Sequence, residues 1–179
     1  MGTLTDVQIK YDECWAKTTP SGQPGISVEQ HCRTAGVVAG LLARKYPQWL
    51  KDILDIRTGI ILAALHDVGK VSPGFQKKCF AWLKRRGLTA AEFAGMDEDH
   101  ARMSQKTVQD FMAGENLLLW AAIVGAHHGK LKGNHLSSLC DGGEAWTAER
   151  HRLVEELVRE FGLLPEHPPP NIDCGSLWF

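Results

Sequence analysis

An unbroken apolar run that leads directly into a histidine and a carboxylate most constrains what this chain can fold into. Residues 60–65, Ile-Ile-Leu-Ala-Ala-Leu, have no polar face, which is typical of a helix buried on all sides. His66 and Asp67 follow at its end, where burying titratable side chains is costly unless a partner compensates. A metal ion is the simplest such partner. Gly69 suits a position just past the helix end, where a left-handed backbone conformation is often needed. Lys70 would then provide a fixed positive charge beside the site.

The composition is that of an ordinary globular protein. The 179 residues suffice for one domain with a genuine core, and 44% hydrophobic and 23% charged residues argue against disorder. The formal net charge is −1, so a nucleic acid would have to bind a local basic patch. Five cysteines without a C-x-x-C pair favour a reducing compartment. With no signal peptide or membrane-length apolar run, we expect a cytoplasmic protein and no membrane partner.

Signals for helix starts and stops recur along the chain, and no stretch shows the alternation of a strand, so the predicted class is all-α. Ser27, with Gln30 three residues on, predicts a capping box at the start of one helix. Further helices are predicted over residues 47–67, with a break near residue 55, and over 72–86, 89–95, 100–111, 117–128 and 145–161.

Four helices each present histidines on an inward stripe or at an end. One predicted inward stripe comprises His31, Ala35, Val38 and Leu42. Another comprises His100, Ser104, Val108 and Phe111. A lone inward histidine is more often a satisfied core residue, but a set from four helices is hard to explain in this way. We therefore predict a metal site between the helices, as in other bundles, with these ligands: His31, His66, Asp67, His100, His127 and His128.

The two adjacent pairs bear on how many ions this site holds. Neighbouring residues on a helix diverge by about 100°, so His66–Asp67 and His127–His128 are poorly placed to bind one ion as tight pairs. At helix ends they could serve two neighbouring ions, with Asp67 bridging. One or two divalent ions are expected, and imidazole favours manganese, iron, cobalt, nickel or zinc over magnesium. Two ions about 3.5–4 Å apart suit phosphodiester hydrolysis.

A basic segment lies next to the predicted site. Its cations, with no acidic residue among them, are Lys70, Lys77, Lys78, Lys84, Arg85 and Arg86. Phe75, Phe80 and Trp82 are interleaved with them, a combination that can guide a phosphate backbone or stack bases. The plainer alternative is a solvated helix whose aromatic residues face the core.

Taken in order, His…His-Asp…His…His-His on an all-α chain resembles the HD superfamily of metal-dependent phosphohydrolases. More narrowly, residues 66–76, His-Asp-Val-Gly-Lys-Val-Ser-Pro-Gly-Phe-Gln, resemble the HD nuclease domain of the CRISPR-associated nuclease-helicase. Residues 15–17, Trp-Ala-Lys, and 100–104, His-Ala-Arg-Met-Ser, fit the same subfamily. The resemblance extends from about Trp15 to Phe179.

This resemblance implies an HD-domain helical bundle that cleaves single-stranded DNA in CRISPR interference. The partners it implies are a helicase domain, in cis or in trans, that feeds in the strand, and the CRISPR surveillance complex. Carried over by position, the six donors become metal ligands. Asp67 and Lys70 become the catalytic candidates, with Lys70 contacting the scissile phosphate, and Ser104 positions a neighbouring group.

The chain also departs from the family pattern. In that family a further helix, which begins near a Leu-Trp-Phe-like segment, ends in an aspartate that completes the site. Because this chain stops at Phe179, residues 1–179 are expected to be a single HD domain excised from a longer protein, without that helix or the helicase. Asp141 and Asp173 are acids of the right kind, but neither lies in a matching context.

Two alternatives use the same residues. An HD-type phosphohydrolase acting on a nucleotide or other small phosphoester needs the same ligands around a closed pocket. A non-catalytic HD module that holds one metal or none, and serves as a docking surface, also remains open.

Overall fold

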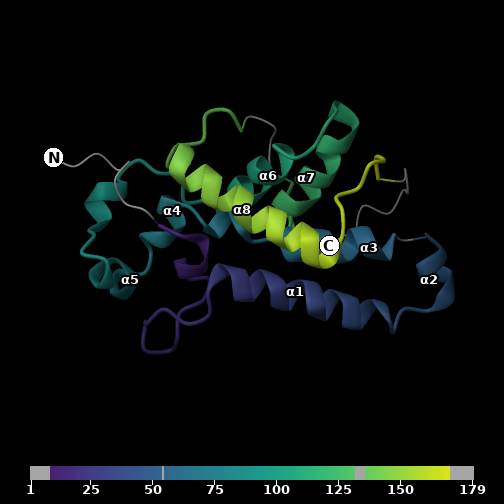
Figure 1. Ribbon diagram of the computed structural model, residues 1–179, viewed down its shortest axis with the longest axis horizontal. Coiled ribbons are helices and arrows are strands. Elements are labelled where there is room, and N and C mark those ends of the chain that lie inside the picture. Colours follow the sequence, from purple (N-terminus) through teal and green to yellow (C-terminus); the bar gives the residue numbers. More distant parts are fainter. Residues whose placement is uncertain (1–8, 54, 132–135, 170–179) are drawn as a thin grey trace.

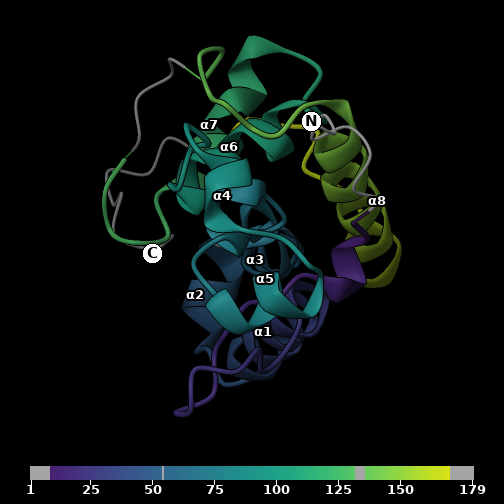
Figure 2. The ribbon, with the colours of Figure 1, turned by 90° about the vertical axis from the view of Figure 1, so that its left-hand side faces the viewer.

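Helix α3 (Ile56–Leu65) carries the apolar run and lies alongside α1 (Val28–Ala43), as Figure 1 shows. In the computed structural model, which describes residues 9–53, 55–131 and 136–169, this helix contacts α1, α7 (Leu118–Gly125) and α8 (Glu144–Phe161). Figure 2 shows α3 between α1 on one side and α6 and α7 on the other, with α8 alongside. Ile61 and Leu65 are fully buried, as a helix without a polar face predicts.

The predicted all-α class is confirmed. Within the described ranges the only strand-like pairings are two isolated β-bridges, Trp15 with Ser27 and Thr18 with Pro24. None of the described helices is both long and apolar enough to cross a bilayer. The remaining helices are η2 (Tyr11–Glu13), α2 (Gln48–Ile53), η3 (Val68–Lys70), α4 (Pro73–Gln76), α5 (Phe80–Arg85), η4 (Ala90–Phe93), α6 (His100–Gln109) and η5 (Glu115–Leu117).

Side-chain caps define where the helices that carry the site begin. The predicted capping box of α1 is present: Ser27 Oγ accepts from the Gln30 N–H at 3.1 Å, and Gln30 Oε1 accepts from the Ser27 N–H at 3.3 Å. The predicted break near residue 55 is also present, because the Asp55 carboxylate caps α3. Asp99 caps α6, which fixes His100 as the first residue of that helix. Such caps satisfy backbone N–H groups that have no partner within the helix.

The inward face of α1 differs from the predicted stripe. Val38 and Leu42 are exposed, at 45% and 56%, and the buried residues are Val28, Cys32, Gly36 and Ala43. A Cβ atom on Gly36 would lie 2.8 Å from the ring of Phe161 and 3.1 Å from the Cβ of Ala64. The helix therefore packs through its small residues, and this rotates its larger apolar side chains outward.

The predicted helix over residues 72–86 is two helices, α4 and α5. Cys79 adopts an extended backbone between them, at the N-cap position of α5. On either side of the break, side chains bond to the N-terminal segment: Gln76 Nε2 donates to the Trp15 carbonyl, and Trp82 Nε1 donates to the Glu13 carbonyl. These long-range bonds outweigh the local helical pattern.

Candidate metal centre

The six candidate ligands all lie at or near helix ends that converge on one place. His31 is in the first turns of α1, His66 follows the last residue of α3, and His100 begins α6. Asp67 precedes η3, and residues 127–128 follow the end of α7. Because α3 contacts α1 and α7, and α6 contacts η3 and α7, these ends meet beside the core.

The Asp67 carboxylate lies at the centre of the cluster and is 3% exposed. Its Oδ2 atom lies 2.8 Å from His31 Nε2 and 3.0 Å from His66 Nε2. Its Oδ1 atom lies 3.2 Å from His100 Nε2 and 3.4 Å from His127 Nε2. The two carboxylate oxygens thus face different pairs of imidazoles.

Two histidines are held with the Nε2 atom toward the cluster. His66 Nδ1 lies 2.8 Å from the Ala63 carbonyl, and His127 Nδ1 lies 2.8 Å from the Val124 carbonyl. A carbonyl oxygen can only accept, so each Nδ1 carries the proton and donates it. In the neutral imidazole, Nε2 is then the lone-pair donor, which is the arrangement of metal-binding histidines.

Burial and hydrogen bonding act on the Asp67 pKa in opposite directions. Burial raises the pKa of this carboxyl group, but the surrounding imidazoles, that of His100 foremost and that of His31 at 2.8 Å, outweigh burial and hold the pKa well below its usual range. Asp67 is therefore ionised at neutral pH.

Two buried atoms in the cluster have no hydrogen-bond partner among the described residues, Asp67 Oδ1 and His127 Nε2. Both are electron-pair donors, they lie 3.4 Å apart, and orphaned buried polar atoms are rare in folded proteins. The ligand atoms also form two groups whose members lie within 4.8 Å of one another: His31, His66 and Asp67, and His100, His127 and His128. The residues present therefore fit divalent cations.

Each adjacent pair, His66–Asp67 and His127–His128, belongs to one ligand group. This differs from the prediction that neighbouring residues would diverge too far to bind one ion together. His66 Nε2 and Asp67 Oδ2 lie only 3.0 Å apart, because α3 ends at Leu65 and the backbone of Asp67 is no longer helical. His127 and His128 likewise lie beyond α7, with ring centroids 4.2 Å apart. A bridging position for Asp67 remains compatible with this geometry, since its two oxygens face different imidazole pairs.

Gly69 matters for close packing rather than for a left-handed backbone. It is not among the glycines with positive φ, and it lies in η3. A Cβ atom there would lie 2.2 Å from the His100 carbonyl oxygen and 2.3 Å from the Ser104 backbone nitrogen. Ser104 Oγ accepts from the Gly69 N–H at 2.9 Å. The turn that follows Asp67 is therefore fixed directly against α6.

The residues of the basic segment lie in different surroundings. Lys70 is buried and its Nζ lies 2.7 Å from Asp67 Oδ2. Lys77 and Lys78 both pair with Glu98. Further along, Arg85 bonds to Gln23, Arg86 pairs with Glu13, and Lys84 is exposed.

The three aromatic residues of the segment also differ in their surroundings. The ring centroid of Phe75 lies 5.2 Å from that of His100, so Phe75 packs against the site. Phe80 is exposed, and Trp82 is buried.

Asp141 lies in a network separate from the cluster. Its Oδ2 atom lies 3.2 Å from Lys106 Nζ and 3.2 Å from an Arg150 nitrogen, and its Oδ1 atom accepts from the Gly143 N–H. Arg150 also donates to the Val71 carbonyl, directly after η3. Asp173 lies outside the described residues.

Buried Gln76 and Arg150 support the site but were not predicted from the sequence. Gln76 bonds to both the N–H and the carbonyl of Trp15 and to the carbonyl of Lys70. Gln76 is the last residue of the Ser-Pro-Gly-Phe-Gln run, so its motif was a usable signal. Arg150 lies on a helix of mixed charge that gives no sign of its burial.

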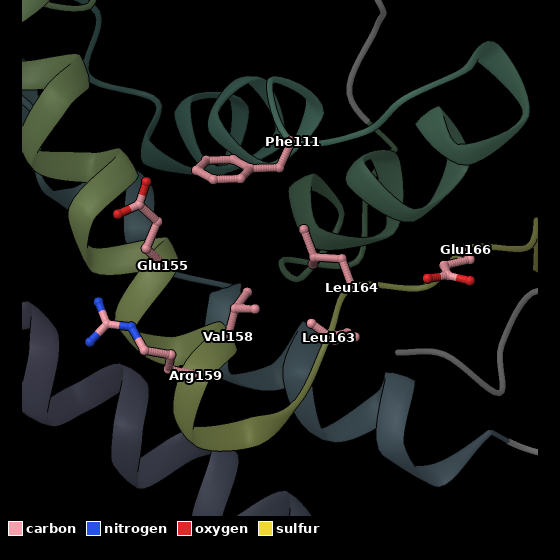
Figure 3. A pocket seen from close by; sticks show the side chains of 7 residues that line it. All are labelled: Phe111, Glu155, Val158, Arg159, Leu163, Leu164 and Glu166. Carbon is pink, nitrogen blue, oxygen red and sulfur yellow. The ribbon is translucent and has the colours of Figure 1, made fainter.

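The cluster lines a hollow of about 500 Å³, together with Ala16, Lys17, Lys70 and Phe75. A second hollow, of about 510 Å³, lies between α8 and the end of α6 and shares no lining residue with the first. Apolar side chains, including Phe111, Val158 and Leu164, and charged ones line it, and no histidine is among them (Figure 3). Of these two hollows, the first has the donors for metal chemistry.

Comparison with known protein families gives a match over the region that contains the candidate metal site. The sequence model described as Cas3, HD domain, matches residues 15–175, which include all six donors and the basic segment. The chain belongs to the Cas3 HD-domain family. Neither curated proteins nor solved structures gave a match.

Membership in this family establishes the general activity. The Cas3 HD domain is a CRISPR-associated hydrolase of the nuclease class, it depends on divalent metals, and its substrate is a nucleic acid. The resemblance seen in residues 66–76 is confirmed, and the described residues contain a His/Asp cluster that could hold a metal ion.

Proposed function

We propose that residues 1–179 form one HD nuclease domain that cleaves phosphodiester bonds of single-stranded DNA in CRISPR interference. The observation that carries this proposal is the convergence of imidazoles on both oxygens of one buried carboxylate, Asp67. Such an arrangement would suit two neighbouring divalent cations, which phosphodiester hydrolysis commonly uses.

His31, His66 and Asp67 would hold one ion, and His100, His127 and His128 would hold a second. An imidazole-rich set favours manganese, nickel, cobalt, iron or zinc, and magnesium less. When bound, such ions supply Lewis acidity and lower the pKa of water.

The remaining groups of the hollow prepare the site. The carbonyl oxygens of Ala63 and Val124 fix the tautomer and orientation of two ligand rings. Lys70 balances the charge of Asp67, and this pairing offsets part of the cost of burying the ionised carboxylate. Phe75 forms an apolar part of the wall of the hollow.

A polynucleotide substrate is favoured by the surroundings of the hollow. Phe75, at its wall, lies with its ring centroid 5.4 Å from Lys78 Nζ. Lys77 precedes Lys78 in the chain, Lys84 and Arg85 lie in the last turn of α5, and Arg86 follows its end. Cations and an aromatic ring beside the cluster suit a strand rather than a single nucleotide. We assign the helicase, in cis or in trans, and the CRISPR surveillance complex as partners, in the cytoplasm.

One observation favours the alternative, hydrolysis of a nucleotide or other small phosphoester. A hollow of about 500 Å³ lies within the range of small-molecule sites, about 300–1,000 Å³. The two functions differ in substrate and not in ligands.

The deciding experiment offers both substrates to the same metal-loaded protein. With manganese or nickel, circular single-stranded DNA should be nicked and then degraded, and a chelator should stop the reaction. His66→Ala should abolish cleavage. His151→Ala, whose imidazole pairs with Asp110 outside the cluster, should not. Consumption of free nucleotides with intact DNA would support the alternative instead.

A further inference from the structure

Two lysines line the hollow that contains the histidine cluster, and they differ in what their ammonium groups contact. Lys70 is only 4% exposed, and its Nζ lies 2.7 Å from Asp67 Oδ2 and 3.5 Å from the carbonyl oxygen of Ala16. An ammonium group has three donors, so two of them are engaged within the protein. Lys70 therefore has little capacity left for a substrate phosphate.

Lys17 lines the same hollow but is exposed. Its ammonium group makes no ion pair or hydrogen bond with any residue of the described ranges. Cations of the basic segment near the hollow are already paired, Lys77 and Lys78 with Glu98. Because the charges of Lys70 and Asp67 cancel one another, Lys17 is the uncompensated lysine of the hollow.

The backbone around Lys17 is held in place on both sides. The N–H of Gly25 donates to the Lys17 carbonyl at 2.8 Å, and the N–H of Ala16 donates to the Ile26 carbonyl at 2.9 Å. A Cβ atom on Gly25 would lie 2.8 Å from the Lys17 carbonyl oxygen, so the two segments approach as closely as glycine allows. Trp15 is bonded through its backbone to buried Gln76. The side chain of Lys17 therefore extends from a fixed position at the hollow.

We propose that Lys17, rather than Lys70, binds a backbone phosphate of the DNA strand at the histidine cluster. This inference rests on the proposed function and specifies which residue holds its substrate. Lys70 then acts inside the protein: it balances Asp67 and ties the carbonyl of Ala16, the residue before Lys17, to the site. A phosphate contact of this kind is independent of base sequence and weakens with salt.

The test measures binding of a fluorescent single-stranded oligonucleotide in chelator, where no cleavage occurs, at several salt concentrations. Loss of one phosphate contact reduces the slope of log K against log salt by about 0.7 for single strands. Lys17→Ala should show this reduction and Lys17→Arg should restore the slope. The control is Lys45→Ala, an exposed lysine just after the end of α1, which should leave the slope unchanged. With manganese present, Lys17→Ala should raise KM for DNA and leave kcat near the wild-type value.

Different outcomes separate this inference from the proposed function. Cleavage of DNA by the wild type, with the same salt slope for Lys17→Ala as for Lys45→Ala, would overturn the role of Lys17 and leave the nuclease intact. A slope that depends on Lys17, in a protein that cleaves no DNA with any transition metal, would support the binding role and overturn the nuclease. No salt-dependent binding of the oligonucleotide by the wild type would overturn the role of Lys17.

Discussion

The Nε2 atom of His31 lies 2.8 Å from the Oδ2 atom of Asp67, although 36 positions separate the two residues in the chain. One residue is on the helix capped by Ser27, and the other follows the central apolar helix. Packing of α1 against α3 through small residues such as Gly36 brings the two side chains together. The metal site thus depends on how closely these helices approach.

Each donor group should hold its own ion, so single substitutions should change the number of ions bound. His31→Ala and His128→Ala each remove a ligand from one group only. We expect either variant to bind one manganese ion per chain where the wild type binds two, as measured by elemental analysis after dialysis or by calorimetry. His151→Ala is the matched control. Two ions retained in both variants would contradict the assignment of two separate groups.

Removing the Asp67 charge should damage both the site and the fold. Asp67→Asn leaves Lys70 buried without its counter-charge, and breaking a buried pair in this way costs about 3–5 kcal/mol. We expect lower stability in urea denaturation of the metal-free protein. DNA cleavage should fall by at least about 100-fold, since even the indirect supports of a metal ligand contribute about 10–100-fold. Lys70→Met in the Asp67→Asn background should recover part of the stability but none of the cleavage.

Substitution by alanine should lower the stability of the protein at Gly69 and raise it at Gly59. At Gly69 the new Cβ would meet the backbone of His100 and Ser104, which cannot move aside as a flexible side chain would. Overpacking of this kind costs about 1–3 kcal/mol or more. Gly59, inside α3, has no neighbouring atom within 4 Å of such a Cβ, so alanine there should stabilise the protein by about 0.4–1 kcal/mol. Urea denaturation of the two variants checks both signs.

The ionised form of Asp141 should stabilise the fold at neutral pH. Burial raises the pKa of this carboxyl group, but the Gly143 N–H, Arg150 and Lys106 outweigh it and lower the pKa below its usual value. A lowered folded-state pKa means that the stabilisation is complete above the unfolded pKa, about 3.9, and is lost as the pH falls through the folded value.

Asp141→Asn should therefore destabilise the protein at pH 7 by about 1.5–3 kcal/mol, the usual contribution of hydrogen bonds to a charged group. The difference from the wild type should shrink as the pH falls below about 4. Asp52→Asn, at an exposed carboxylate that bonds to Gln48, should change stability by less than about 0.5 kcal/mol at either pH. A difference for Asp141→Asn that grew on acidification would show that the carboxylate is not stabilised as described.

Most of the donor set was predictable because it depends on local signals. His66 and Asp67 follow an apolar run that has to be buried, and His100 follows a run of acids typical of a helix start. The family resemblance of residues 66–76 was equally local. These features need no knowledge of which helices are neighbours.

The rest depends on contacts between distant segments, which no local pattern encodes. The inward face of α1 was predicted with Val38 and Leu42, but close approach through Gly36 rotated them outward. Lys17 and Lys70 differ in whether the ammonium group is already paired, and this depends on which of them contacts Asp67 in the folded chain. Arg150 reaches the carbonyl of Val71 from 79 positions away, so its burial could not be read from its own helix.

The most direct test of the account is an anomalous-scattering crystal structure of the protein loaded with manganese. Two peaks about 3.5–4 Å apart are expected, one beside His31 and His66 and the other beside His100, His127 and His128, with Asp67 between them. Peaks elsewhere, or no peak at this cluster in a crystal saturated with the metal, would contradict the central claim.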